Sequence, residues 1–220
     1  MNFEQARSNM VLNQLRANRI SNSSLIEKIE LFPRENLYPK SYKHLAYSDK
    51  IIFLDDGRFI LPPLTSFHLV QALGEIKNEN ILEIGSGFGT STSIISKFST
   101  NIDCIETSQQ MTQVFKESLT EGLFDASLLD LNIEEFFSNK NPNIQKYQKI
   151  IINGSLDEEP LNLIKNVSDN SEIVCIIDNK DFKHKIVKYL KVGGKSNKFV
   201  IDEASSSYIY KYVQSEPFVF

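Results

Sequence analysis

The chain has 220 residues, of which 41% are hydrophobic and 24% charged, and its formal net charge is -4. This length and composition suit one soluble globular domain with a substantial core. The acidic balance gives no general attraction to nucleic acid or to anionic lipid. The first residues lack the pattern of a secretory signal, and no apolar stretch approaches the roughly 20 residues that span a bilayer. We therefore expect a cytoplasmic protein that binds neither nucleic acid nor membrane.

The first 63 residues predict helices followed by a loop-rich lid. Apolar positions recur at helical spacing from Phe3 to Asn18. A second helix is expected after the polar cluster at residues 21–24, which can cap it, and Pro33 stops this helix. The stretch from residue 33 to 63 carries turn signals around the short apolar run 51–54 and fits a lid or a hairpin.

From residue 64 to 220, helices and strands alternate. We predict strands at residues 80–84, 102–105, 126–129, 149–152 and 173–177, with helices between them. Such alternation predicts an α/β fold with a doubly wound, mostly parallel sheet that is covered on both faces. Two later β-rich runs, joined through Gly193 and Gly194, predict an antiparallel hairpin at one edge.

Metal chemistry has no support in the sequence. Cys104 and Cys175 each lie in an apolar run typical of a buried strand, so we interpret them as core thiols. The cysteines lack the spacing of a zinc site, and His44, His68 and His184 are scattered. We therefore predict no metal site.

A glycine-rich turn follows the predicted strand at residues 80–84. Glycines at alternating positions let the backbone fold back and let a ligand approach the main chain, which a Cβ would block. Hydroxyl side chains follow and can cap the next helix, whose amino end favours an anionic group such as a carboxylate. We expect a ligand site formed here by Gly85, Ser86, Gly87, Gly89 and Thr90.

The spacing of the glycines separates two classes of cofactor. A dinucleotide fingerprint needs its third glycine where Thr90 stands, which argues against a nicotinamide dehydrogenase. The pattern E-x-G-x-G-x-G, which begins at Glu83, resembles that of S-adenosylmethionine-dependent methyltransferases. This resemblance implies S-adenosyl-L-methionine as the cofactor.

Three acidic residues are candidates to hold that cofactor. Glu106 ends the strand after the turn, where a carboxylate can take both ribose hydroxyls. Asp130 lies where a methyltransferase usually contacts the adenine amine, although an acid that begins a turn is common. Glu83 could be only a solvated strand-end charge, and Glu106 only a helix-capping acid. The neighbouring Thr107 and Leu131 complete the predicted cofactor-binding set.

Over nearly its full length the chain resembles bacterial protein-L-isoaspartate O-methyltransferases, as a diverged member. The matching pieces, in order, are ARSNMVLNQLR, FPRENLYP, LAYSDK, DDGRFILPP, ILEIGSGFG and SEPFVF. The resemblance implies a seven-stranded Rossmann-like methyltransferase sheet with a helical amino-terminal extension over the cofactor. It also implies methyl transfer to the carboxylate of a protein isoaspartyl residue, or of a related small acceptor, beside the loop before Pro62.

The chain departs from the family at that loop. Repair enzymes usually present a serine or threonine just ahead of the proline, whereas residues 59–61 here are Phe-Ile-Leu. Thr65 and Ser66 follow on the first turn of a predicted helix and either reach the site or cap the helix. With Arg58 they are our candidates to orient an acceptor carboxylate, although Arg58 could equally be a surface charge.

Two functions remain open at this point. The first is a carboxyl methyltransferase, which needs no general base because its acceptor is already ionised near neutral pH. The second is a protein that binds S-adenosylmethionine but has lost transfer to isoaspartate, with a regulatory role or a different acceptor. The apolar run at residues 59–61 suggests this alternative. Both predict cofactor binding, and turnover separates them; the sequence leaves the oligomeric state open.

Overall fold

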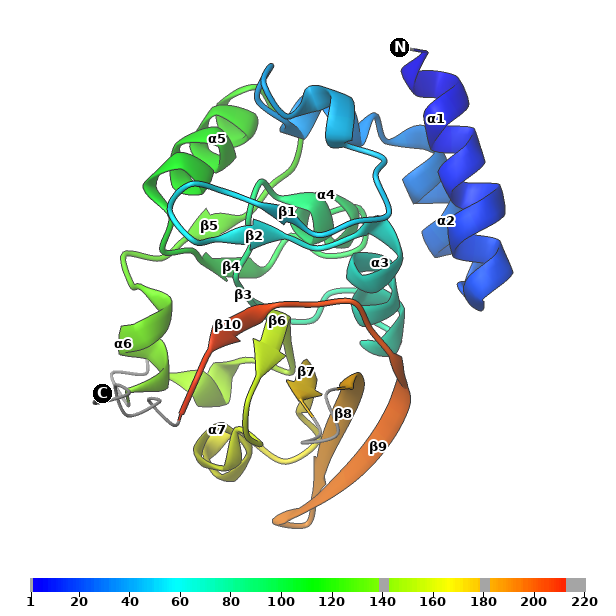
Figure 1. Ribbon diagram of the computed structural model, residues 1–220. Coiled ribbons are helices and arrows are strands. Elements are labelled where there is room, and N and C mark those ends of the chain that lie inside the picture. Colours follow the sequence, from blue (N-terminus) through cyan, green and yellow to red (C-terminus); the bar gives the residue numbers. More distant parts are fainter. Residues whose placement is uncertain (1, 139–142, 179–182, 213–220) are drawn as a thin grey trace, which may run out of the picture.

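The computed structural model describes residues 2–138, 143–178 and 183–212. Its centre is one sheet with the strand order β5-β4-β3-β6-β7-β8-β9, and β10 pairs with the far part of β6 (Figure 1). The strands are β3 (Ile81–Ile84), β4 (Ile102–Ile105), β5 (Ser127–Leu128), β6 (Lys149–Leu156), β7 (Glu172–Asp178), β8 (His184–Val192), β9 (Lys195–Glu203) and β10 (Tyr208–Tyr210). The mostly parallel sheet is confirmed, with β10 as an eighth strand beyond the seven expected.

Helices connect the parallel strands. They are α4 (Thr90–Ile95), α5 (Gln109–Thr120), α6 (Ile133–Phe137) and α7 (Leu161–Asn166), and α3 (Pro63–Ala72) leads from the amino-terminal part into β3. Because both faces of the central strands are covered, β6 is buried at every position. Cys104 and Cys175 are free, buried thiols in β4 and β7, as the sequence predicted.

The amino-terminal part forms helices and one small hairpin. A helical run consists of α1 (Phe3–Asn9), a π-helical turn (Met10–Leu15) and a 3-10 turn (Arg16–Asn18), and α2 (Ser23–Leu31) follows. The Asn22 side chain caps α2 by accepting from the Leu25 backbone N–H. The strands β1 (Ile52–Phe53) and β2 (Phe59–Ile60) pair antiparallel, so the loop-rich segment contains the hairpin that was one of two alternatives. One continuous hydrophobic core joins these elements to the sheet.

The register of the sheet brings the ends of β3 and β4 beside the middle of β6. Ile84 of β3 lies opposite Ile105 of β4 on one side and Ile152 of β6 on the other. The residues that follow Ile84 and Ile105 begin loops, whereas β6 continues to Leu156. The carboxyl edge of the sheet formed in this way is where open α/β sheets bind ligands.

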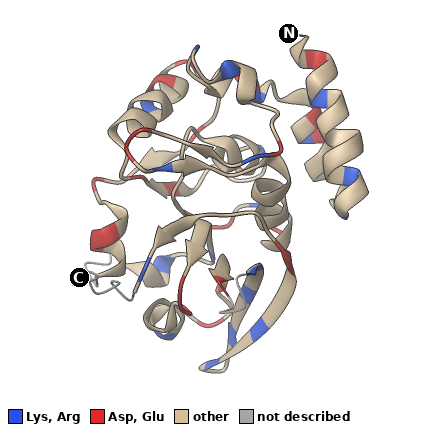
Figure 2. Cartoon of the chain, viewed as in Figure 1, with Lys and Arg blue, Asp and Glu red and all other residues tan. Residues whose placement is uncertain are grey.

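The predicted hairpin at the far edge is confirmed. β8 and β9 pair antiparallel around Gly193 and Gly194, and β9 is the edge strand. Figure 2 shows lysines spaced along this hairpin. Across the described residues, the helices are too short or too polar to cross a membrane.

Candidate functional site

The glycine turn has the backbone conformation that its sequence predicted. Gly85, Gly87 and Gly89 all have positive φ angles, of 77°, 59° and 89°. A Cβ on Gly89 would lie 2.6 Å from the ring of Phe124, so internal packing requires that glycine. A Cβ on Gly87 would meet nothing within 4 Å. Gly87 is therefore the part of the turn that a ligand can approach.

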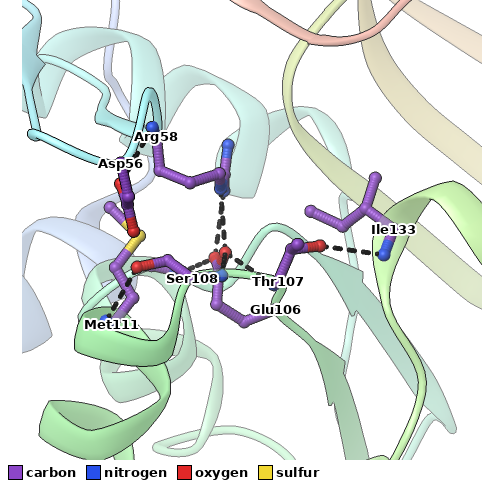
Figure 3. A network of polar contacts seen from close by, with 8 residues as sticks. Asp56, Arg58, Glu106, Thr107, Ser108, Met111 and Ile133 are labelled. Carbon is purple, nitrogen blue, oxygen red and sulfur yellow. Dashed lines mark hydrogen bonds and ion pairs between the residues drawn. The ribbon is translucent and has the colours of Figure 1, made fainter.

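Glu106 lies beside this turn and accepts several hydrogen bonds (Figure 3). Arg58 of the β1–β2 hairpin forms a bidentate, fork-like ion pair with Glu106, with Nε 2.8 Å from Oε1 and Nη2 2.9 Å from Oε2. The backbone N–H of Gly87 donates to Oε2 at 2.8 Å. The N–H groups of Thr107 and Ser108 donate to Oε1. The carboxylate thus holds together the β1–β2 hairpin, the glycine turn and the segment that leads into α5.

These contacts keep Glu106 ionised. Burial is the largest influence on its pKa and would raise it, because the side chain has 0% exposure. The hydrogen bonds and charge of Arg58, with the backbone N–H groups, outweigh burial and lower the pKa below its ordinary value. Glu106 is therefore a fixed acceptor for hydrogen-bond donors.

Arg58 is not a surface charge. Its side chain is 12% exposed, and the guanidinium lies 3.2 Å from the place of a Cβ on Gly85. Ile209 of β10 packs against the same glycine and against Gly154. The chain's own side chains therefore occupy much of the space beside the first glycine.

Glu83 supports the turn from beneath. Its carboxylate is fully buried and accepts from the Thr92 hydroxyl at 2.6 Å and the Asn153 amide at 2.7 Å. Burial raises its pKa to about 7. The alternative of a solvated strand-end charge is therefore wrong, and Glu83 links the start of α4 to the middle of β6.

Two hydroxyls of the turn lack a partner among the described residues. Ser86 Oγ and Thr90 Oγ1 are buried, and neither forms a hydrogen bond with any described residue. Both residues line a small cavity of about 20 Å³, which Ser66, Gly87 and Asn153 also line. Orphaned buried hydroxyls are costly unless a ligand or water satisfies them.

The two hydroxyl candidates of α3 behave differently. The side chain of Pro62, the residue that precedes α3, makes no capping bond, and neither Thr65 nor Ser66 makes one. Thr65 donates to the backbone carbonyl of Ser205 at 3.0 Å and so anchors the segment before β10. Ser66 faces the small cavity at the glycine turn.

The remaining predicted residues lie at the same edge of the sheet. Thr107 Oγ1 accepts from the backbone N–H of Ile133 at 3.0 Å, which fixes the start of α6. Asp130, in the loop after β5, is exposed, and Leu131 packs partly buried against the core. In the described part of the chain, no group of three His, Cys, Asp or Glu side chains is placed to hold a metal ion.

Sequence reasoning missed two contributors. Asn153 bridges to Glu83 from β6, and a signal existed, since this polar amide follows the apolar run at residues 150–152. Ile209 reaches the turn because β10 pairs with the end of β6. Nothing in the sequence indicates the strand with which residues 208–210 pair.

The donor set suits an adenosine group that carries an amino-acid tail. It combines an ionised acid, a free-facing Gly87, two orphaned hydroxyls and the amino end of α4. The site does not yet have room for this group, because the Arg58 guanidinium already donates to both carboxylate oxygens of Glu106. The chemistry therefore fits the group, provided that Arg58 moves.

Comparisons with known proteins agree on one family. The family model "Protein-L-isoaspartate(D-aspartate) O-methyltransferase (PCMT)" matches residues 6–211. A protein-L-isoaspartate O-methyltransferase of Aliivibrio fischeri is 22% identical over 199 residues, which cover 90% of this chain and 93% of that protein. One from Klebsiella pneumoniae is 23% identical over 207 residues, covering 94% and 95%.

Solved structures show the same fold. A Plasmodium falciparum protein described as a protein-L-isoaspartate O-methyltransferase, in complex with S-adenosyl-L-homocysteine, has a TM-score of 0.76 at 15% identity. The match covers 96% of this chain and 99% of that one. A second protein-L-isoaspartate O-methyltransferase has a TM-score of 0.70 at 17% identity, covering 93% and 66%.

Proposed function

Because this chain belongs to the protein-L-isoaspartate O-methyltransferase family, we propose that it transfers a methyl group from S-adenosylmethionine to the carboxylate of isoaspartyl residues in proteins. The observation that carries the proposal is the juxtaposition of the Gly87 turn with the ionised Glu106 at the carboxyl edge of the sheet, within a full-length family match.

Four groups of this chain would hold the cofactor. Glu106 supplies acceptors for ribose hydroxyls, and Gly87 lets the ligand approach the backbone. Ser86 and Thr90 supply hydroxyls that otherwise lack partners. When bound, the cofactor supplies a methyl group on a positively charged sulfur, which an acceptor oxygen can displace. Asp130 remains a candidate for the adenine amine.

The acceptor needs positioning rather than activation. A carboxylate is ionised at neutral pH, so no base has to remove a proton. Rate then comes from alignment and from exclusion of water. Phe59, Ile60 and Leu61 are buried and line the cavity beside the turn, which suits the exclusion of water.

Ser66 is the best-placed hydroxyl to orient the acceptor. The usual hydroxyl ahead of the proline is replaced by Leu61 and its neighbours, and Thr65 is already bonded to a backbone carbonyl. Ser66 lines the cavity from α3, and its hydroxyl makes no hydrogen bond to another side chain or backbone group among the described residues. We therefore assign it the positioning role, in place of the absent loop hydroxyl.

Transfer of a labelled methyl group tests the proposal. Purified protein, S-adenosylmethionine labelled in its methyl group and an isoaspartyl peptide should give base-labile label that is released as methanol. The same peptide with normal aspartate is the matched control and should stay unlabelled. Glu106→Ala should abolish labelling, whereas Ser66→Ala should lower kcat. Tight cofactor binding without label in either peptide would favour a binding protein or a different acceptor.

A further inference from the structure

The fork between Arg58 and Glu106 occupies the two oxygens that a ribose would use. Both carboxylate oxygens accept from the guanidinium at 2.8 and 2.9 Å. A ribose offers two neighbouring hydroxyl donors, so it would compete for the same acceptor atoms. The Arg58 guanidinium therefore occupies the carboxylate to which the cofactor ribose is expected to bind.

The free space beside the glycine turn is small. The cavity beside the turn holds about 20 Å³, which is roughly room for one water molecule. Pockets that take small ligands usually measure roughly 300–1,000 Å³. Arg58 is carried by the short β1–β2 hairpin, and among the described strands β1 and β2 pair with each other and not with the main sheet. Movement of the Arg58 side chain away from Glu106 would therefore break no hydrogen bond between the strands of the main sheet.

We infer that Arg58 is an internal competitor that sets how tightly this chain binds S-adenosylmethionine, because the cofactor must displace its guanidinium from Glu106. The inference rests on the proposed function and assigns Arg58 a role other than orienting the acceptor. The apparent affinity for the cofactor equals the intrinsic affinity multiplied by the fraction of molecules in which Glu106 is free of Arg58. Removing the guanidinium therefore tightens binding.

Calorimetric titration with S-adenosylhomocysteine tests the inference. Arg58→Ala should bind at least tenfold more tightly than the wild type. Arg58→Lys keeps the charge but lacks the fork, so it should fall between them and serves if the alanine variant fails to fold. Arg16→Ala is the matched control, because Arg16 pairs with Glu30 at the surface, and its affinity should equal that of the wild type.

A nitrogen-15 spectrum gives a second readout that does not depend on turnover. The Arg58 Nε–H signal, identified by its absence from Arg58→Lys, should shift when ligand binds the wild type, because the bond to Glu106 breaks. Equal or weaker binding by Arg58→Ala, or an unmoved signal, would overturn the inference and leave the proposed function standing. Absence of binding by the wild type and by both variants would overturn both.

Discussion

The amide nitrogen of Asn153 donates to the carboxylate of Glu83 at 2.7 Å and so links the neighbouring strands β6 and β3 beneath the glycine turn. Thr92 donates to the other carboxylate oxygen from the first turn of α4. Glu83 is fully buried, and burial raises its pKa from 4.5 to about 7. The ligand-facing turn therefore rests on a carboxyl group that titrates near neutral pH.

Glu83→Gln should change how stability depends on pH. A raised pKa means that the folded protein holds the proton more tightly than the unfolded chain does. Glu83 therefore lowers the free energy of unfolding as pH rises from about 4.5 to about 7, by at most roughly 3 kcal/mol. Glutamine mimics the neutral acid, so the variant should lack this loss.

Urea denaturation of both proteins between pH 5 and pH 8 measures the difference. The stability of Glu83→Gln relative to the wild type should increase up to about pH 7 and then level off. Glu83→Ala is the contrasting variant, because it also lacks the titrating group but leaves the Asn153 and Thr92 donors buried without an acceptor. It should therefore be roughly 2–4 kcal/mol less stable than Glu83→Gln at every pH in this window. Parallel pH curves for the wild type and the glutamine variant would contradict the assignment.

Two glycines of the turn should differ in whether their substitution affects stability or ligand binding. Gly89→Ala places a Cβ 2.6 Å from Phe124 at a φ of 89°, so it should lower the free energy of unfolding by roughly 2–4 kcal/mol. Gly87→Ala meets nothing within 4 Å and should cost only about 1 kcal/mol.

Binding of S-adenosylhomocysteine should show the opposite order. The Cβ of Gly87→Ala projects into the space left for a ligand, so this variant should bind more than tenfold more weakly while it remains folded. Thermal unfolding and calorimetric titration on the same samples compare the two properties. Equal binding by Gly87→Ala and the wild type would show that the ligand does not approach that residue.

The sequence predicted the glycine turn and the acid beside it, because local patterns determine both. The apolar strand ahead of Gly85 and the acid that ends the next strand each follow from periodicity and turn chemistry. Parallel neighbours then had to bring Glu106 to the turn, and the register confirms that they are adjacent.

The contents of the site could not be predicted in the same way. Arg58 lies 48 positions before Glu106, and Ile209 reaches Gly85 from the other end of the chain. Such contacts depend on how a hairpin and a late strand pack over the sheet edge, and no periodic pattern encodes that packing. The sequence therefore located the crevice without showing what fills it.

The strand β10 is held by an aromatic cluster. The ring of Tyr210 stacks on Phe137 of α6, with centroids 4.6 Å apart, and Tyr212 meets both rings edge-on. Alternating aromatic residues near the end of the sequence favour packing inside the molecule, and Tyr210 and Tyr212 confirm this, while Phe218 and Phe220 lie outside the described residues. Packing here also positions Ile209 over the glycine turn.

Tyr210→Ala should lower the free energy of unfolding by about 1–3 kcal/mol, because the stacked contact and its buried area are lost. Tyr210→Phe keeps the ring and should lie within about 0.5 kcal/mol of the wild type. Hydrogen exchange should accelerate at residues 208–210 in the alanine variant alone. Equal exchange in both variants would show that the stack does not hold β10.

Glu172 of β7 joins two lysines on one face of the sheet. Its Oε2 lies 2.7 Å from Lys149 Nζ and 2.7 Å from Lys188 Nζ, and the three side chains are 10–20% exposed. Lys149 also donates to the backbone carbonyl of Leu73, which fixes the end of α3. A single carboxylate therefore compensates two largely buried cations.

Glu172→Gln should cost roughly 2–4 kcal/mol of unfolding free energy, because it leaves both ammonium groups without a counter-charge. Glu30→Gln is the matched control, since Glu30 pairs with Arg16 where both side chains are about half exposed, and it should cost under about 1 kcal/mol. In the double variant Glu172→Gln with Lys188→Met, part of the loss should return, because one uncompensated cation is gone. Urea denaturation of the three variants and the wild type measures these differences. A loss in Glu172→Gln no larger than in Glu30→Gln would mean that solvent screens the buried pair as fully as the exposed one.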